Sequence, residues 1–233
     1  MTQELFVLVE KREDQIVVCG FATRNYVHNN SLRHMAVQVI PVALDSTGNN
    51  CIIFIHRRSP FKRTSGNKLD FAGGHITFDN QFFPQLYWDA PVLLEKASLY
   101  SALREAQEEV RCEPPIEFTT KNIFRFSNVG AFECDALRDD RVSRNREFST
   151  AFVLALPPNH KVTMWDTDRE GEHQLEVTEI TFEELLKEYK NKPEDFADGA
   201  SRILDKVSKD PSLARELQKL IVEAAKSVYQ KGR

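Results

Sequence analysis

Short runs of apolar residues, typical of strands, dominate the first third of the chain. Residues 4–24 form two such runs joined by a charged turn at residues 11–14, and this pattern predicts a β-hairpin. Residues 35–44 and 51–58 are apolar and rich in β-branched side chains. A turn sequence separates them, so we expect an adjacent strand pair. Gly73-Gly74 then ends a short strand and lets the backbone turn sharply and approach a ligand closely.

A helical period replaces the strand pattern from about residue 91 to Cys112. The apolar positions of this segment recur at helical spacing and form one stripe: Leu99, Leu103, Ala106 and Val110. Before it, residues 76–90 are rich in aromatic side chains but show no steady period. We expect them to form a long loop that packs against another part of the molecule.

The second half of the chain predicts further strands and a helix. Strands are expected over residues 122–134 and 146–156, with a polar loop between them. Thr181 and Glu184 have the spacing of a capping box, which predicts the start of a helix over residues 182–190.

A last helix is predicted from Asp210, a plausible N-cap, and Pro211, at the first helical position. Its apolar face comprises Leu213, Leu217, Leu220, Ala224 and Val228. Strands with interspersed helices and no regular βαβ alternation indicate a mixed α+β or α/β-sandwich domain.

Composition and charge narrow the expected partners. The net charge is −4, so no global field attracts nucleic acid or an anionic membrane. An anionic small-molecule partner would therefore need locally placed cations or bound metal ions. The four cysteines are widely spaced and form no CxxC pair, which argues against a structural zinc site and a disulfide framework. The N-terminus has neither a signal-peptide nor a transmembrane pattern, so a cytoplasmic location is expected.

The helix over residues 91–112 carries the candidate chemistry. Glu105, Glu108 and Glu109 stand at positions i, i+3 and i+4, so all three project from one face, apart from the apolar stripe. Three carboxylates at this spacing repel one another, and a divalent cation such as Mg²⁺ would reverse that interaction. The alternative is a solvent-exposed charged face, with Arg104 or Arg111 simply balancing the glutamates.

The order of these motifs resembles the Nudix hydrolase family, whose signature is G-x5-E-x7-R-E-U-x-E-E-x-G-U with U a bulky aliphatic residue. Gly74 matches the opening glycine, Arg104 and Glu105 match R-E, and Glu108 and Glu109 match E-E. The resemblance implies an α/β/α sandwich around a mixed sheet. It also implies Mg²⁺- or Mn²⁺-dependent hydrolysis of a nucleoside diphosphate derivative.

The resemblance further implies roles for individual residues. Glu105, Glu108 and Glu109 would bind metal or activate water, the Gly73 carbonyl would be a further ligand, and Arg104 would orient the glutamates. A homodimer is common in the family. We expect a hairpin extension over residues 1–34, a Nudix-like domain over residues 35–190, and a C-terminal helical extension over residues 191–233 that packs on the same domain.

The chain departs from the signature at several positions. The segment between Gly74 and Arg104 is longer, and Lys96 stands where the signature has its first glutamate. Ala106 is smaller than the usual aliphatic residue, and Arg111 replaces the glycine after E-E. These departures keep open a second interpretation, a Nudix fold that binds a nucleotide or a protein without turnover.

Residues 4–75 also resemble the Nudix subgroup that includes isopentenyl diphosphate isomerase. In that enzyme histidines at the positions of His28, His34 and His75 help to bind a metal. A cysteine does acid-base chemistry where this chain has Gly73, so a prenyl diphosphate isomerase-like activity is disfavoured. For His28 and His34 we favour half-buried side chains that are hydrogen-bonded near a strand start.

Several weaker candidates complete the predicted site. The cations that could contact substrate phosphate, with His75 beside them, are Arg57, Arg58, Lys62 and Arg63. The same cations fit a solvated hairpin rim. Candidates for a further acidic ligand or base are Asp166, Asp168 and Glu170 in an acidic loop, and Glu133 and Glu147. Phe82, Phe83, Tyr87 and Trp88 are more typical of packing than of base stacking.

Overall fold

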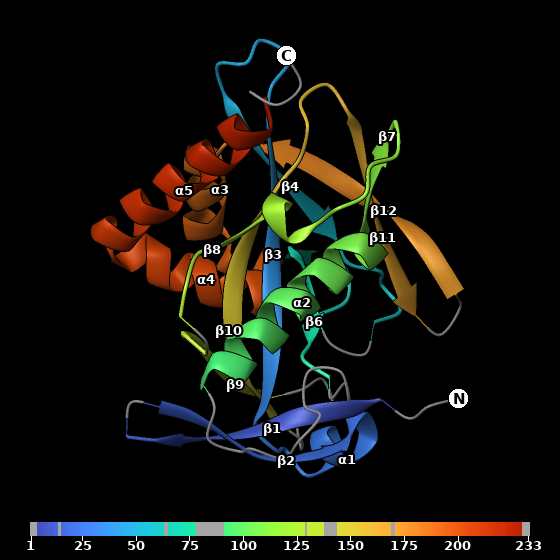
Figure 1. The fold of residues 1–233 in the computed structure, drawn as a ribbon, viewed down its shortest axis with the longest axis vertical. Coiled ribbons are helices and arrows are strands. Elements are labelled where there is room, and N and C mark those ends of the chain that lie inside the picture. Colours follow the sequence, from blue (N-terminus) through green and yellow to red (C-terminus); the bar gives the residue numbers. More distant parts are fainter. Residues whose placement is uncertain are drawn as a thin grey trace.

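The structure is a computed structural model, and it describes residues 4–13, 15–62, 65–77, 91–128, 130–137, 144–168 and 171–229. One mixed β-sheet runs through the middle of the molecule (Figure 1). Its central strand β3 (His34–Leu44) is buried along its whole length. β3 pairs in parallel with β10 (Arg144–Ala155) and antiparallel with β4 (Cys51–Arg57). A strand covered on both faces has a nearly continuous apolar sequence, which explains the β3 pattern.

The N-terminal hairpin consists of β1 (Leu5–Arg12) and β2 (Gln15–Thr23), which pair antiparallel as predicted. The short helix α1 (Arg24–Asn29) follows directly and was not predicted. Thr23 Oγ1 caps it by accepting a hydrogen bond from the backbone N–H of Tyr26. A helix this short cannot show a helical period in the sequence.

Two groups of strands extend the sheet on either side of β3 and β4. From β4, antiparallel pairing continues in the order β12 (Gly171–Ile180), β11 (Lys161–Asp168) and β7 (Val110–Glu113). The short strands β5 (Leu69–Asp70) and β6 (Ala72–His75) pair with β4 and β3. The strands β8 (Ile123–Arg125) and β9 (Phe132–Leu137) both pair with β10.

Helices cover both faces of the sheet (Figure 1). The helix α2 (Pro91–Glu109) packs on one face, and the residues between them form one buried core cluster. A second cluster joins the opposite face to α3 (Phe182–Asn191), α4 (Asp198–Lys209) and α5 (Pro211–Tyr229). Two 3-10 turns, Thr120–Asn122 and Pro193–Asp195, complete the structure. The predicted α+β class, with a mixed sheet, an N-terminal hairpin and C-terminal helices, is confirmed.

The predicted starts of two helices are also confirmed. Thr181 and Glu184 form a reciprocal capping box at the start of α3. The carboxylate of Asp210 accepts hydrogen bonds from the backbone N–H groups of Ser212 and Leu213 in the first turn of α5. Both caps satisfy N–H groups that have no partner within their helix.

Two predicted boundaries are wrong. The helix α2 ends at Glu109 rather than Cys112, and the chain continues as β7, in which Val110 and Cys112 are buried while Arg111 is exposed. That two-residue alternation is the period of a strand. The predicted strand over residues 122–134 is two strands, β8 and β9. Gly130, between them, has a φ of +70°, which a regular strand does not allow.

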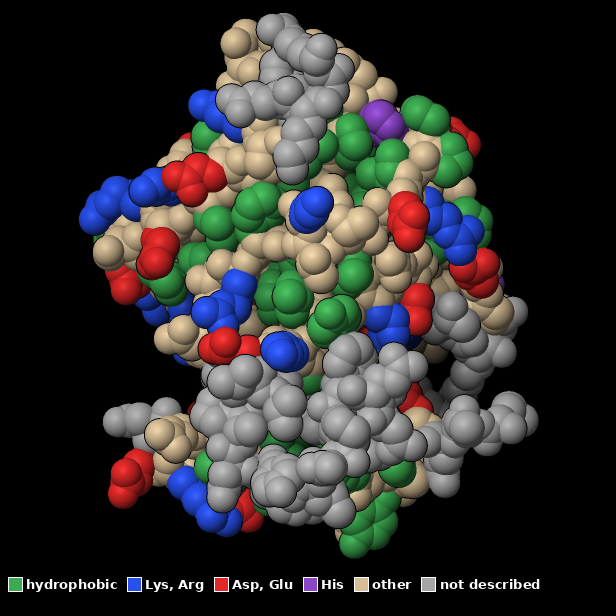
Figure 2. All heavy atoms as spheres, in the orientation of Figure 1, with side chains coloured by type: hydrophobic (Ala, Val, Ile, Leu, Met, Phe, Trp, Pro, Cys, Tyr) green, Lys and Arg blue, Asp and Glu red, His purple; other side chains and the backbone are tan. Residues whose placement is uncertain are grey.

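Positive and negative side chains are interspersed over the face shown in Figure 2. This agrees with the small net charge of −4 and with the expectation that no single-sign field covers the molecule. Among the helices that the structure describes, none is long and apolar enough to span a membrane. The predicted aromatic loop with Phe82, Phe83, Tyr87 and Trp88 lies outside the described residues.

Candidate functional site

The carboxylates of α2 lie against the Gly73-Gly74 pair of β6. The Gly73 N–H donates a hydrogen bond of 3.0 Å to Glu109 Oε2. A Cβ atom on Gly74 would overlap the carboxylate of Glu105, and one on Gly73 would lie 2.5 Å from the Val37 carbonyl oxygen. Because only glycine lacks this atom, Gly74 allows α2 to approach the sheet this closely, and Gly73 allows β6 to lie close to β3.

Arg104 ties α2 to the end of β6. Its guanidinium donates hydrogen bonds to the His75 carbonyl oxygen at 3.0 Å and to Thr77 Oγ1 at 3.1 Å. It also donates to Glu105 Oε1 at 2.6 Å, so the Glu105 carboxylate is fixed relative to β6. This geometry fits the orienting role that the resemblance implies for Arg104, and that role stays a prediction.

The three glutamates of α2 differ in their surroundings. Glu105 is 7% exposed, and burial raises its pKa to about 7 although the Arg104 charge opposes the shift. Burial raises the pKa of Glu109 well above its usual range, and the neighbouring Glu105 charge adds to this effect. Glu108 is exposed at the edge of the cavity that the site lines. Glu105 and Glu109 are therefore two neighbouring carboxylates whose ionised forms are both unfavourable.

The α2 carboxylates line a cavity of about 890 Å³. The cationic side chains that line it are Arg24, Arg58, Lys62, Arg104 and Arg202. Arg57, predicted to contact substrate, is not among the lining residues: it donates a hydrogen bond of 2.8 Å to the Asn67 carbonyl and lines a smaller neighbouring cavity. Of the predicted phosphate-binding cations, Arg58 and Lys62 line the cavity of the glutamates, and Arg63 lies outside the described residues.

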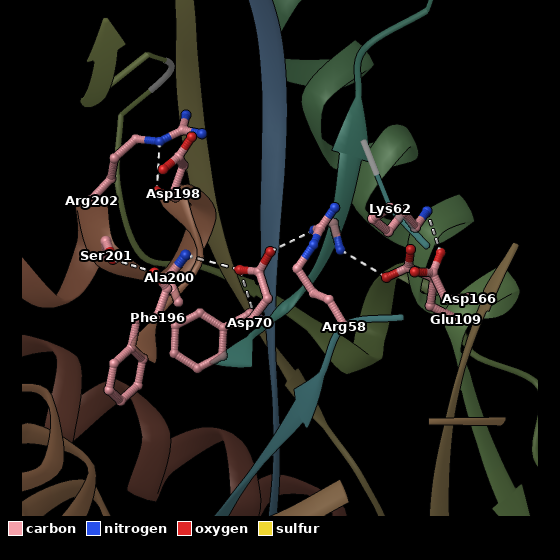
Figure 3. A network of polar contacts seen from close by, with 12 residues as sticks. Arg58, Lys62, Asp70, Glu109, Asp166, Phe196, Asp198, Ala200, Ser201 and Arg202 are labelled. Atoms are coloured by element: carbon pink, nitrogen blue, oxygen red, sulfur yellow. Dashed lines mark hydrogen bonds and ion pairs between the residues drawn. The ribbon is translucent and has the colours of Figure 1, made fainter. Parts of the chain in front are cut away.

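Asp166 brings a further carboxylate to the same place (Figure 3). Its side chain is 8% exposed, and Lys62 Nζ lies 2.5 Å from its Oδ1. The Asp166 charge contributes to the raised pKa of Glu109, so the two carboxylates are close neighbours. The sequence prediction placed Asp166 in an acidic loop, whereas it stands in strand β11.

The other acidic candidates do not join this group. Glu133 pairs with Arg33 at the surface, at 3.3 Å, and is not among the lining residues. Glu147 lines the cavity from β10, but its contacts are with histidines and an arginine. The side chain of Asp168 and the whole of Glu170 lie outside the described residues.

Three histidines converge beside the glutamates. Their ligating nitrogens, from His28 on α1, His34 on β3 and His75 on β6, all lie within 4.8 Å of one another. The ring of Phe6 stacks on His75 with 4.1 Å between the ring centroids. His34 is only 1% exposed, so it is fully buried rather than half-buried as predicted, and its Nδ1 contacts the Leu32 carbonyl oxygen at 2.9 Å near the start of β3. The sequence could not show their convergence, because it depends on the pairing of three separate elements.

Glu147 connects this histidine cluster to α4. Its Oε1 lies 3.6 Å from His34 Nε2 and 3.5 Å from His75 Nε2, while Arg202 Nη2 lies 2.6 Å from its Oε2. Burial opposes ionisation of Glu147, but the Arg202 charge and the contacts with the histidines hold its pKa well below the usual range. Burial lowers the pKa of His75 to about 4, so its imidazole is neutral at physiological pH.

The donor sets fit divalent metal ions. Glu105 and Glu109 offer only oxygen atoms, which suits Mg²⁺ or Mn²⁺. A cation would offset both the cost of ionising these buried carboxylates and the repulsion between them. The histidine cluster offers imidazole nitrogens, a donor set that suits transition metals.

Asp70, Asp198 and Arg202 are charged residues of the cavity wall that were not among the predicted site residues. Asp70 is buried and the Arg202 side chain is only 9% exposed, and both charges are paired, as charges withdrawn from water usually are. Asp198 and Arg202 lie in α4, which was not predicted from the sequence. An amphipathic period over residues 198–209 would have been the feature to find.

Several solved structures are similar in fold. The MutT protein from Methanosarcina mazei Go1 is 13% identical with a TM-score of 0.45, over 80% of this chain and 96% of that one. A NUDIX hydrolase from Alicyclobacillus acidocaldarius is 14% identical with a TM-score of 0.41, over 67% and 82%. An Ap4A hydrolase from C. elegans is 12% identical with a TM-score of 0.34, over 75% and 96%. These similarities concern the fold alone. The sequence matches no protein-family model and no curated protein.

Proposed function

We propose that this protein is a divalent-metal-dependent hydrolase that cleaves a diphosphate linkage, in a nucleoside diphosphate derivative or a related compound. The observation that carries the proposal is the juxtaposition of Glu105 and Glu109 with the glycine pair of β6, at the wall of a cavity that also presents Arg58 and Lys62. Carboxylates that hold a metal and cations that hold phosphates are the two parts that diphosphate hydrolysis needs.

The residues of α2 and β6 would hold the cation. Glu105, Glu109 and the exposed Glu108 would hold Mg²⁺ or Mn²⁺, with the Gly73 carbonyl as a further ligand. The cation, when bound, polarises a phosphoryl oxygen and neutralises phosphate charge. Arg104 keeps Glu105 in place through its bonds to β6.

Other side chains of the cavity bind the substrate and accept a proton. Arg58 and Lys62 bind phosphate oxygens and stabilise the charge on the leaving phosphate. A water molecule attacks one phosphorus atom, the bond to the bridging oxygen breaks, and a carboxylate accepts the proton from the water. Glu109 and Asp166 are the candidates for this base, because both lie at the cavity wall close to each other.

A phosphate-release screen tests the proposal. Purified protein with Mg²⁺ or Mn²⁺ is assayed against nucleoside diphosphate derivatives, nucleoside triphosphates and prenyl diphosphates. Glu109→Gln should lower turnover by roughly 100-fold or more, because it removes a charged metal ligand. Turnover that survives this substitution contradicts the proposal. Binding of metal and nucleotide without any turnover supports a non-catalytic binding module instead.

The histidine cluster favours a second candidate, a prenyl diphosphate isomerase-like enzyme. His28, His34 and His75 converge as metal ligands would, with Glu147 beside them. Gly73 stands where that chemistry would need a thiol. Isomerisation of isopentenyl diphosphate that is lost in His34→Ala would favour this second candidate. Hydrolysis that His34→Ala leaves intact would favour the first.

A further inference from the structure

Asp70 is a buried carboxylate at the junction of the sheet and α4. It is 3% exposed, and its Oδ1 accepts hydrogen bonds from the backbone N–H groups of Ala200 at 2.9 Å and Phe71 at 3.0 Å. Its Oδ2 accepts a hydrogen bond of 2.7 Å from Arg58 Nη1. Asp70 therefore caps the first turn of α4 and holds a cation of the candidate site at the same time.

Arg58 stands between two groups of negative charge (Figure 3). Asp70 lies on the α4 side, while Glu109 and Asp166 lie on the side of α2 and β11. All three carboxylates attract the Arg58 guanidinium, and Asp70 contributes the largest share. The Arg58 side chain is 23% exposed, so these attractions act where water screens them weakly.

We infer that Asp70 is a positioning residue, which draws Arg58 toward α4 and so weakens its competition with a divalent cation at Glu109. The inference rests on the proposed metal site at Glu105 and Glu109. Without the Asp70 charge, the Arg58 guanidinium, which already points toward both groups (Figure 3), lies wholly with Glu109 and Asp166 and competes there more strongly with the metal ion. Metal affinity then depends on a residue that belongs to the α4 junction and does not itself bind the metal.

Asp70→Asn isolates the charge of this residue. The asparagine Oδ1 still accepts hydrogen bonds from the N–H groups of Ala200 and Phe71, so the cap of α4 is kept. Its amide nitrogen, however, faces the Arg58 donor and cannot hold it. Binding of Mn²⁺ should weaken by roughly 10-fold, the size of effect that a partner outside the ligand set produces.

The experiment is a titration of the whole protein with Mn²⁺, followed by electron paramagnetic resonance of the free ion, without substrate. Wild type is compared with Asp70→Asn, Arg58→Gln and the double variant. The double variant should recover the lost affinity, because the competing cation is gone. Asp45→Asn is the matched control, since Asp45 also accepts several hydrogen bonds but lies outside the cavity. Circular dichroism checks that each variant is folded.

The outcomes separate the inference from the proposed function. Wild type that binds no Mn²⁺, or Glu109→Gln that binds it like wild type, overturns both. If Glu109 is needed for Mn²⁺ binding but Asp70→Asn binds like wild type, the inference alone is overturned. It is also overturned if Asp70→Asn lowers the affinity for Mn²⁺ and the double variant has the same lowered affinity. Asp70 would then act only through the structure of the α4 junction.

Discussion

At the scale of the residue, Gly74 shows how a missing Cβ atom shapes the site. A Cβ atom on this residue would overlap the carboxylate of Glu105. We expect Gly74→Ala to displace Glu105, to weaken Mn²⁺ binding, and to lower the free energy of unfolding by about 1–3 kcal/mol through overpacking. Gly20→Ala is the matched control, because its Cβ atom would meet Leu8 at an ordinary 3.8 Å. Calorimetric Mn²⁺ titration and urea unfolding measure the two effects, and equal behaviour of both variants would contradict this account.

The raised pKa of Glu105 also predicts a pH dependence of stability. Its pKa is about 7 in the folded protein and 4.5 as an ordinary glutamate, so the folded state holds the proton more tightly. The free energy of unfolding of the metal-free protein should therefore fall as the pH rises from about 4.5 to 7, by on the order of 3 kcal/mol from this residue.

Urea unfolding in the presence of EDTA at several pH values measures this slope. Glu105→Gln should flatten it, because the substituted side chain no longer titrates. Glu108→Gln, which removes an exposed carboxylate from the same helix, is the comparison. An unchanged slope in Glu105→Gln would show that Glu105 does not cause the dependence.

At the scale of the element, the sequence predicted those parts whose signal is local. The β1–β2 hairpin, the β3–β4 pair and the caps of α3 and α5 were found, because alternation, turn residues and capping spacings lie within a few positions. The end of α2 was misplaced, because Val110 fits both a helical stripe and the two-residue period of β7.

The candidate site likewise has a part that local spacing predicts and a part that it does not. The glutamates of α2 share one helix, so their common face could be predicted from spacing. The approach of Asp166, the convergence of the three histidines and the link from Asp70 to Arg58 each join elements that are distant in the sequence. Contacts of that kind depend on strand pairing and helix packing, which one sequence does not specify locally.

At the scale of the whole molecule, the C-terminal helices share a core with the sheet that supports the site. Leu217 of α5 is 2% exposed and belongs to this cluster. Leu217→Ala should lower the free energy of unfolding by about 2–5 kcal/mol, because it leaves a cavity in a packed core. Since α5 packs on β10, β3 and α4, the loss should appear as one cooperative transition, seen alike by tryptophan fluorescence and circular dichroism. Leu213→Ala, on the same helix but only partly buried, should lower the free energy of unfolding by a smaller amount. Two separate transitions would instead show that residues 191–233 unfold as an independent unit, and the link from α4 to Arg58 would then lose its rigid support.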